Sequence, residues 1–216
     1  MFELESFLSA WQEAVLGEFG YARVRFLGIQ GSRSRGEERP GSDIDAVLIL
    51  DGLTSADAAR YARCTAALPE RDKLCGFIGG WAELERWPRG ELWQFCLDTR
   101  PLLGSLEPIA ALASGREAVR EAALGSLGAV YHGSAHAILQ RGCNEALGEL
   151  YKGAFFALRA LRCLETGEEL RTRAQLSAGA GEFERAILSG ALPGTAEEQC
   201  GALLDWAAMR LRRLDM

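Results

Sequence analysis

Residues 21–50 read Tyr21-Ala-Arg-Val-Arg-Phe-Leu-Gly-Ile-Gln30, Gly31-Ser-Arg-Ser-Arg-Gly-Glu-Glu-Arg-Pro-Gly-Ser42 and Asp43-Ile-Asp-Ala-Val-Leu-Ile-Leu50. The first and third segments are rich in β-branched, aromatic and other apolar residues, which indicates two strands. The middle segment is rich in glycine, serine and charged residues, which is typical of a loop. This stretch therefore predicts a strand, a long loop and a second strand that begins with two acidic residues.

Asp43 and Asp45 are separated by a single residue at the start of the second strand. Because side chains alternate between the two faces of a strand, both carboxylates are expected on one face and Ile44 in the core. Two carboxylates a few ångströms apart repel each other unless a cation lies between them. Mg²⁺ accepts one or two carboxylates and completes its coordination with water and phosphate oxygens. Asp43 and Asp45 are therefore predicted to be metal ligands.

The start of the loop has the residue types of a phosphate-binding turn. Gly31 lets the backbone approach a phosphate closely, and Ser32 can offer its hydroxyl and its N–H to the same anion. Arg33 and Arg35 lie just beyond and carry guanidinium groups that suit phosphate oxygens, although in a long loop they can equally be solvated. The glycine spacing is that of a P-loop, but Glu37 and Glu38 stand where lysine and Ser/Thr must follow, which excludes that motif.

The periodicity of apolar residues predicts the remaining elements. Helices are expected at about 4–19, 54–68 and 82–87, and strands at about 74–78 and 92–98. Beyond about Pro108 only helical patterns remain, most clearly at about 144–165 and 196–214. We therefore expect an α+β domain over residues 1–110, a mixed sheet flanked by helices, followed by an all-α helical-bundle domain over residues 111–216.

The composition indicates a soluble globular protein, since 48% of the 216 residues are hydrophobic and 25% are charged. The net charge of −6 argues against bulk binding to nucleic acid or to an anionic membrane surface. No run approaches the roughly 20 apolar residues of a membrane span, and the acidic N-terminus is unlike a signal peptide. Six scattered cysteines without a C-x-x-C pair indicate free thiols. We expect a cytoplasmic protein.

The pair Gly31-Ser32, followed after ten residues by Asp43-Ile-Asp45 at the head of an apolar strand, resembles the signature of the nucleotidyltransferase superfamily. This superfamily includes DNA polymerase β, the kanamycin and lincosamide nucleotidyltransferases and the minimal nucleotidyltransferases. The resemblance implies that Ser32 holds a nucleoside triphosphate and that Asp43 and Asp45 bind Mg²⁺. A nucleoside monophosphate, with AMP from ATP as the expected case, would pass to a hydroxyl, and pyrophosphate would leave. An acidic turn at the surface is the alternative interpretation.

Active members of this family carry a third carboxylate on a later strand. The expected strand at 74–78 contains none, so Asp98, at the end of the next expected strand, is the best candidate for a catalytic role, with Asp72 behind it. Asp98 could as easily bond the backbone of a turn. If no third carboxylate is present, the domain would bind nucleotide with little or no transfer.

Lys152 is one of only two lysines among 24 basic residues. In antibiotic nucleotidyltransferases a lysine from the C-terminal helical domain reaches the triphosphate, and Lys152, on the polar edge of the 144–165 helix, resembles that lysine. The alternative is a solvated surface lysine.

Two functions are consistent with the resemblance. The first is transfer of a nucleotide to a small molecule, such as an aminoglycoside- or lincosamide-like antibiotic. The second is a regulatory or antitoxin-like nucleotide-binding protein that nucleotidylates or binds a partner protein, with weak or no catalysis. A template-dependent polymerase is disfavoured by the small size and the acidic charge. Because family members often complete their sites across a dimer, the resemblance also allows a homodimer.

Overall fold

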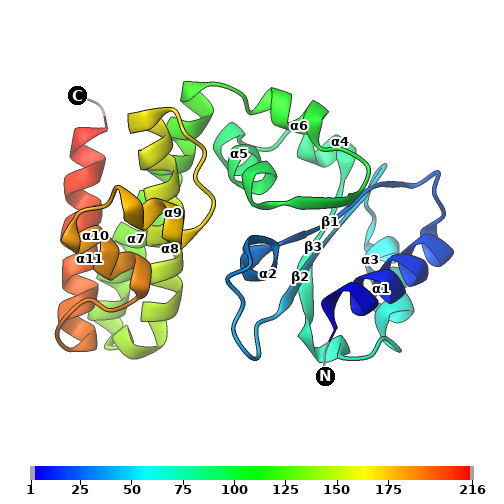
Figure 1. Ribbon diagram of the computed structural model, residues 1–216, viewed down its shortest axis with the longest axis horizontal. Helices are drawn as coiled ribbons and strands as arrows, with labels where there is room; N and C mark the ends of the chain where they lie inside the picture. The colour runs from blue at the N-terminus through cyan, green and yellow to red at the C-terminus, as the bar shows by residue number, and fades with distance from the viewer. Residues whose placement is uncertain (1–2, 215–216) are drawn as a thin grey trace. The chain divides into compact units, whose positions relative to one another are not determined.

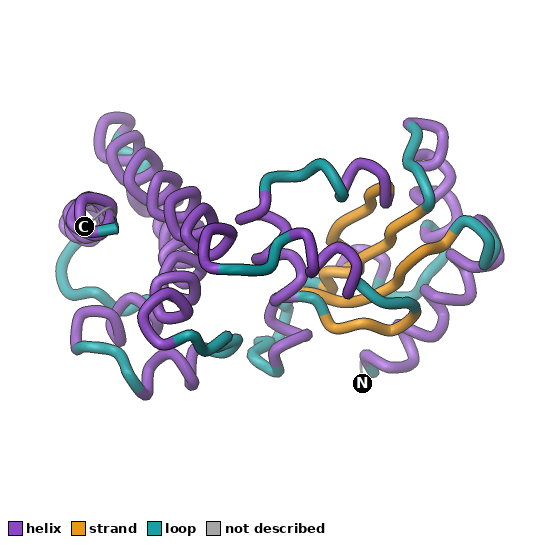
Figure 2. Tube along the Cα trace, turned by 90° about the horizontal axis from the view of Figure 1, so that it is seen from above, coloured by secondary structure: helices purple, strands orange, loops and turns teal. Residues whose placement is uncertain are grey.

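The computed structural model describes residues 3–214 and separates into two compact units (Figure 1). The first unit comprises the chain up to Trp87 together with Asp98–Leu112, and the second comprises Pro88–Leu97 and the chain from Ala113 onward. Within the described residues, every strand belongs to the first unit and the second is helical, as the colouring of Figure 2 shows.

The first unit is built on a four-stranded mixed sheet with the strand order β3-β2-β1-β4. Its strands are β1 (Val24–Gln30), β2 (Ile44–Leu50), β3 (Leu74–Gly80) and β4 (Arg100–Leu103). Its helices are α1 (Leu4–Phe19), α2 (Gly31–Arg35), α3 (Ser55–Thr65), η1 (Arg71–Lys73), α4 (Trp81–Leu84) and α6 (Glu107–Leu112). The β2 strand runs antiparallel to β1 and parallel to β3, and β4 runs antiparallel to β1. The predicted mixed sheet is confirmed.

One face of this sheet is covered by α1 and α3. Trp11 of α1 is fully buried in this core, and its indole Nε1 donates a hydrogen bond to the Tyr61 hydroxyl of α3 at 3.0 Å. Ile44 lies in the same core, as its position in the sequence predicts. Because side chains alternate along β2, Asp45 points to the opposite face, where Gln30 of β1 is its register partner.

The second unit is a helical bundle in which α7, α8 and α11 pack against one another. Its helices are α7 (Arg116–Gln140), α8 (Cys143–Thr166), α9 (Arg173–Ala178), α10 (Glu182–Ser189), α11 (Ala196–Arg213) and all but the last residue of α5 (Arg89–Asp98). The ends of α8 and α11 lie within two residues of the predicted ends. No helix within residues 3–214 has both the length and the apolar character needed to cross a membrane.

The strand predicted at 92–98 is wrong, because this segment forms α5. Leu92, Trp93, Phe95 and Leu97 are all buried in the helix, so the segment is apolar on nearly every side. A short apolar run of this kind does not distinguish a buried strand from a buried helix by periodicity. The sequence analysis also missed β4, which contains Pro101, and the short helix α2 inside the predicted loop.

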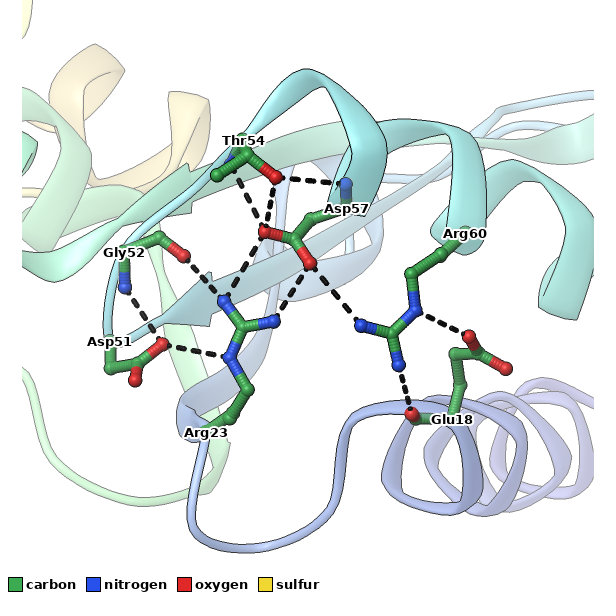
Figure 3. Close-up of polar contacts among 7 residues, drawn as sticks. All are labelled: Glu18, Arg23, Asp51, Gly52, Thr54, Asp57 and Arg60. Carbon is green, nitrogen blue, oxygen red and sulfur yellow. Dashed lines mark hydrogen bonds and ion pairs between the residues drawn. The ribbon is translucent and has the colours of Figure 1, made fainter.

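Partly exposed ion pairs and hydrogen bonds of Arg23 connect segments at the end of β2 that lies farthest from Asp45 (Figure 3). Arg23, which precedes β1, donates from Nη1 to Asp57 Oδ1 at 2.7 Å and from Nε to Asp51 Oδ1 at 3.1 Å. Its Nη2 donates to the Gly52 carbonyl at 3.0 Å. Asp57 also forms a capping box with Thr54, which satisfies N–H groups at the start of α3. These contacts connect β1, β2 and α3.

The hydrogen bond from Arg23, with further bonds from Thr54, lowers the pKa of Asp57 well below its usual range. A carboxylate with a lowered pKa stabilises the fold above its unfolded-state pKa of about 3.9, and this contribution is lost as the pH falls through the folded-state pKa. The Asp57 contribution is therefore fully present at neutral pH and decreases below about pH 4.

We expect Asp57→Asn to lower the Tm by several degrees at pH 7, because the variant loses its ion pair with Arg23. The Tm difference between wild type and variant should shrink as the pH is lowered below about 4. Circular dichroism melts between neutral and acidic pH measure this, with Asp205→Asn, at an exposed site on α11, as a control for the change in charge. A difference that stays constant with pH would contradict the prediction.

Candidate active site

The antiparallel register of β1 and β2 brings Gly31 against Asp45. Gln30, the last residue of β1, pairs with Asp45, and the chain turns into α2 at the next residue. Gly31 has a φ of +72°, and a Cβ added there would meet Asp45 Oδ2 at 2.0 Å. The Asp45 carboxylate therefore lies directly against the Cα of Gly31. Only glycine satisfies both the backbone conformation and this close approach.

Arg33 lies next to this turn, in α2, but its guanidinium contacts backbone. Nε donates to the Asp43 carbonyl at 3.0 Å and Nη2 donates to the Ser42 carbonyl at 2.7 Å. The side chain predicted to contact phosphate thus fixes the segment that carries Asp43 into β2. Its contact with a nucleotide stays a prediction.

Asp98 contacts the same turn, from a distant part of the sequence. Its Oδ2 accepts the Gly31 N–H at 3.1 Å, across 67 residues of sequence. Asp45 Oδ2 and Asp98 Oδ2 lie no more than about 8 Å apart, given the covalent bond lengths around Gly31. The structure therefore places Asp98 on the same turn as Asp45, at the end of a helix instead of a strand, and the catalytic role of Asp98 stays a prediction.

The alternative third carboxylate, Asp72, is exposed in η1, just before β3. The β3 strand itself carries no acidic residue, and its residue beside Asp45 is the exposed thiol Cys75. Of the two candidates from the sequence, Asp98 is the one that forms a hydrogen bond with the Gly31 turn.

Arg35 supplies the positive charge beside Asp98. Its Nη1 lies 2.6 Å from Asp98 Oδ1 and its Nε lies 2.9 Å from Glu37 Oε2. Burial acts to lower the pKa of Arg35, but the two neighbouring carboxylates raise it above its usual value. Arg35 is therefore a permanent cation. The sequence suggested phosphate or solvent for Arg35, whereas in the structure it pairs with Asp98, 63 residues away, and this partner has no local signal in the sequence.

Ser32 follows Gly31 within α2 and is half-buried. Its carbonyl accepts the N–H groups of Gly36 and Glu37, the latter at 2.8 Å, which closes the turn. Gly31 and Ser32 are thus part of a defined hydrogen-bonded turn next to Asp45, and their contact with phosphate stays a prediction.

The donor set at this site consists of hard oxygen atoms. Asp43 is exposed and Asp45 is half-buried against Gly31. Among residues 3–214, no group of three or more His, Cys, Asp or Glu side chains is arranged to hold a metal ion. Two carboxylates fit Mg²⁺, which keeps water and substrate phosphate in the rest of its coordination shell, better than they fit Ca²⁺ or zinc.

Lys152 lies in the second unit, on the exposed side of α8. Its side chain is 60% exposed, and Nζ lies 3.8 Å from Glu149 Oε2. It lines a cavity of about 660 Å³ between α7 and α8, together with His136, Glu145 and Glu149. The assembled group around Gly31 belongs to the first unit, and the role of Lys152 toward a triphosphate stays a prediction.

No protein-family profile matches the chain, and neither does any curated protein sequence. Among solved structures, the spectinomycin adenyltransferase AAD(9) from Enterococcus faecialis, crystallised with ATP and spectinomycin, is similar with a TM-score of 0.60. The similarity covers 98% of this chain and 100% of that chain, at 12% sequence identity. The fold is that of a nucleotidyltransferase. The fold class predicted from the sequence is therefore confirmed.

The contact between Gly31 and Asp45 in this nucleotidyltransferase fold can be tested by Gly31→Ala. The added Cβ must displace the Asp45 carboxylate, so we expect binding of Mn²⁺·ATP, measured by electron paramagnetic resonance, to weaken at least tenfold.

Gly36→Ala is the matched control, because Gly36 has a similar φ of +69° and nothing within 4 Å of an added Cβ. Both variants should lose roughly 1–2 kcal/mol of stability from the left-handed backbone, measured by thermal unfolding. Equal affinities of the two variants for Mn²⁺·ATP would show that the Asp45 contact does not matter for binding.

Proposed function

We propose that this protein is an Mg²⁺-dependent nucleotidyltransferase that moves AMP from ATP to a hydroxyl of a small molecule and releases pyrophosphate. The observation that carries the proposal is the turn at Gly31: the Asp45 carboxylate lies against its Cα, and Asp98 accepts its N–H. The fold, shared with an adenyltransferase crystallised with ATP and spectinomycin, supports it.

In this proposal Asp43 and Asp45 hold Mg²⁺ through their carboxylate oxygens. When bound there, the metal would offset negative charge on the α-phosphate and on the leaving pyrophosphate. Ser32 contacts the triphosphate through its N–H and hydroxyl, Gly31 lets the backbone approach it closely, and Asp98 is the third carboxylate beside the turn. The protein contributes chiefly position and electrostatic complementarity, since the reacting groups need little else from it.

The reaction forms one bond and breaks one bond. The acceptor oxygen bonds to the α-phosphorus, the bond from that phosphorus to the β-phosphate oxygen breaks, and the hydroxyl proton passes to water. The products are an adenylated acceptor and pyrophosphate. We place the protein in the cytoplasm, where ATP and Mg²⁺ are supplied; its six free cysteines are consistent with a reducing compartment.

The acceptor that we favour is a hydroxylated cationic small molecule, such as an aminoglycoside-like antibiotic. The adenyltransferase with the same fold was crystallised with spectinomycin. The net charge of −6 suits a cationic acceptor. A lincosamide-like acceptor is the second member of the test panel.

A partner protein is the alternative acceptor or ligand. On α7, Leu139 is 77% exposed and Tyr131 is 45% exposed, and exposed large apolar side chains on one helix are common at protein–protein contacts. This alternative predicts Mg²⁺·ATP binding with little turnover on any antibiotic.

Pyrophosphate release from each of the four nucleoside triphosphates, with Mg²⁺ and with or without a panel of hydroxylated antibiotics, tests the proposal. We expect release with ATP and at least one acceptor, and none from the Asp43→Asn/Asp45→Asn double variant. Binding of Mg²⁺·ATP without release under any acceptor would exclude the enzyme and favour the binding protein. Unchanged Mg²⁺·ATP binding by the double variant would show that the site is misassigned.

Lys152→Met should raise the KM for ATP about tenfold and leave the KM for the acceptor nearly unchanged, because the lost cation would face phosphate only. Arg212→Met, which removes an exposed positive charge from α11 of the same unit, is the control for net charge. Steady-state kinetics measures both. A KM for ATP equal to that of wild type would identify Lys152 as a solvated surface residue.

A further inference from the structure

One carboxylate contacts both ends of α2. This five-residue helix begins at Gly31 and ends at Arg35. Asp98 accepts the Gly31 N–H through Oδ2 at 3.1 Å and pairs with Arg35 Nη1 through Oδ1 at 2.6 Å. Asp98 therefore spans the helix from its first residue to its last.

The contact is well shielded from solvent. The side chains of Arg35 and Asp98 are 8% and 11% exposed, so their attraction is screened less than that of a surface pair. The backbone near Asp98 is fixed too, since Ser34 Oγ donates to the Asp98 carbonyl at 3.1 Å and Gln30 Nε2 donates to Thr99 Oγ1 at 2.7 Å. Asp98 is thus anchored to α2 by its side chain and by its backbone.

This anchoring bears on how Asp98 contributes to the reaction. A general base must offer a carboxylate oxygen to the hydroxyl proton of the acceptor. In Asp98 one oxygen already receives a backbone N–H and the other receives a buried guanidinium. Both oxygens are therefore engaged by the two ends of α2 and are held in place there.

We infer that Asp98 and Arg35 are a positioning pair that fixes the Gly31-Ser32 turn, and that Asp98 does not serve as the base. The inference rests on the proposed function, since the turn is the element assigned there to the triphosphate. Without the pair, Gly31 can move away from the Asp45 carboxylate. The Gly31-Ser32 turn is then no longer held at a fixed distance from the proposed metal ligand Asp45. Arg35 accordingly acts on the turn through Asp98.

The test compares Asp98→Asn, Arg35→Met and the double variant with wild type. Isothermal titration calorimetry gives the Kd for Mg²⁺·ATP, and steady-state kinetics gives kcat. Arg35→Lys serves as the conservative variant, and Arg39→Met, at an exposed arginine in the same loop, controls for the loss of charge. Circular dichroism melts establish that each variant is folded.

We expect each single variant to weaken Mg²⁺·ATP binding about tenfold and the double variant to weaken it no further, because both changes remove one shared contact. Arg35→Lys should recover part of the affinity, and Arg39→Met should match wild type. A loss of kcat in Asp98→Asn at unchanged Kd would identify a base and overturn the inference. Additive losses in the double variant would overturn it as well.

The chemical shift of the Gly31 amide, measured by NMR without nucleotide, separates this inference from the proposed function. An N–H that donates to a carboxylate should shift in Asp98→Asn and Arg35→Met but not in Arg39→Met. If wild type fails to bind Mg²⁺·ATP, the proposed function falls, while these shifts still decide whether the pair positions the turn. An unchanged Gly31 shift in both variants would overturn the positioning role.

Discussion

The contact between the Asp45 carboxylate and the Cα of Gly31 depends on the register of two antiparallel strands. Gln30 pairs with Asp45, and this pairing places the first residue after β1 beside the second acid of the motif. A slip of one residue would turn Asp45 into the core and Ile44 out of it. The apolar core under α1 and α3, which contains Ile44, therefore fixes the position of the polar site on the other face.

Three arginines hold the segments that precede and follow the paired strands β1 and β2. Arg23 ties β1 to the far end of β2, Arg33 holds the segment that enters β2, and Arg35 links α2 to Asp98. Each donates to at least two acceptors at once, which the planar guanidinium allows and the compact ammonium of lysine does not match. The predominance of arginine over lysine in this chain is thus compatible with the use of arginine to join several acceptors at once.

Local patterns in the sequence predicted the helices at Leu4–Phe19 and Cys143–Thr166 and the strands on both sides of the motif, because their apolar periodicity reflects burial. The same reasoning wrongly predicted a strand at 92–98, because the apolar residues of this segment are buried on nearly every side of a helix. The proximity of Asp98 to Gly31 has no local signal, because it arises from a contact across 67 residues. The sequence could therefore nominate Asp98 by residue type but could not assign its partners.

The partners of the arginines also bear on how an acidic chain would hold a triphosphate. Arg33 donates to backbone carbonyls and Arg35 to two carboxylates, so both cations next to the turn contact groups of the protein itself. Asp43 and Asp45 add negative charge at the same place. Phosphate would then be repelled unless a divalent cation joined it to the carboxylates. The arrangement of charge thus favours the proposal that nucleotide binding requires the metal, with the turn at Gly31 contributing its shape and the Ser32 hydroxyl.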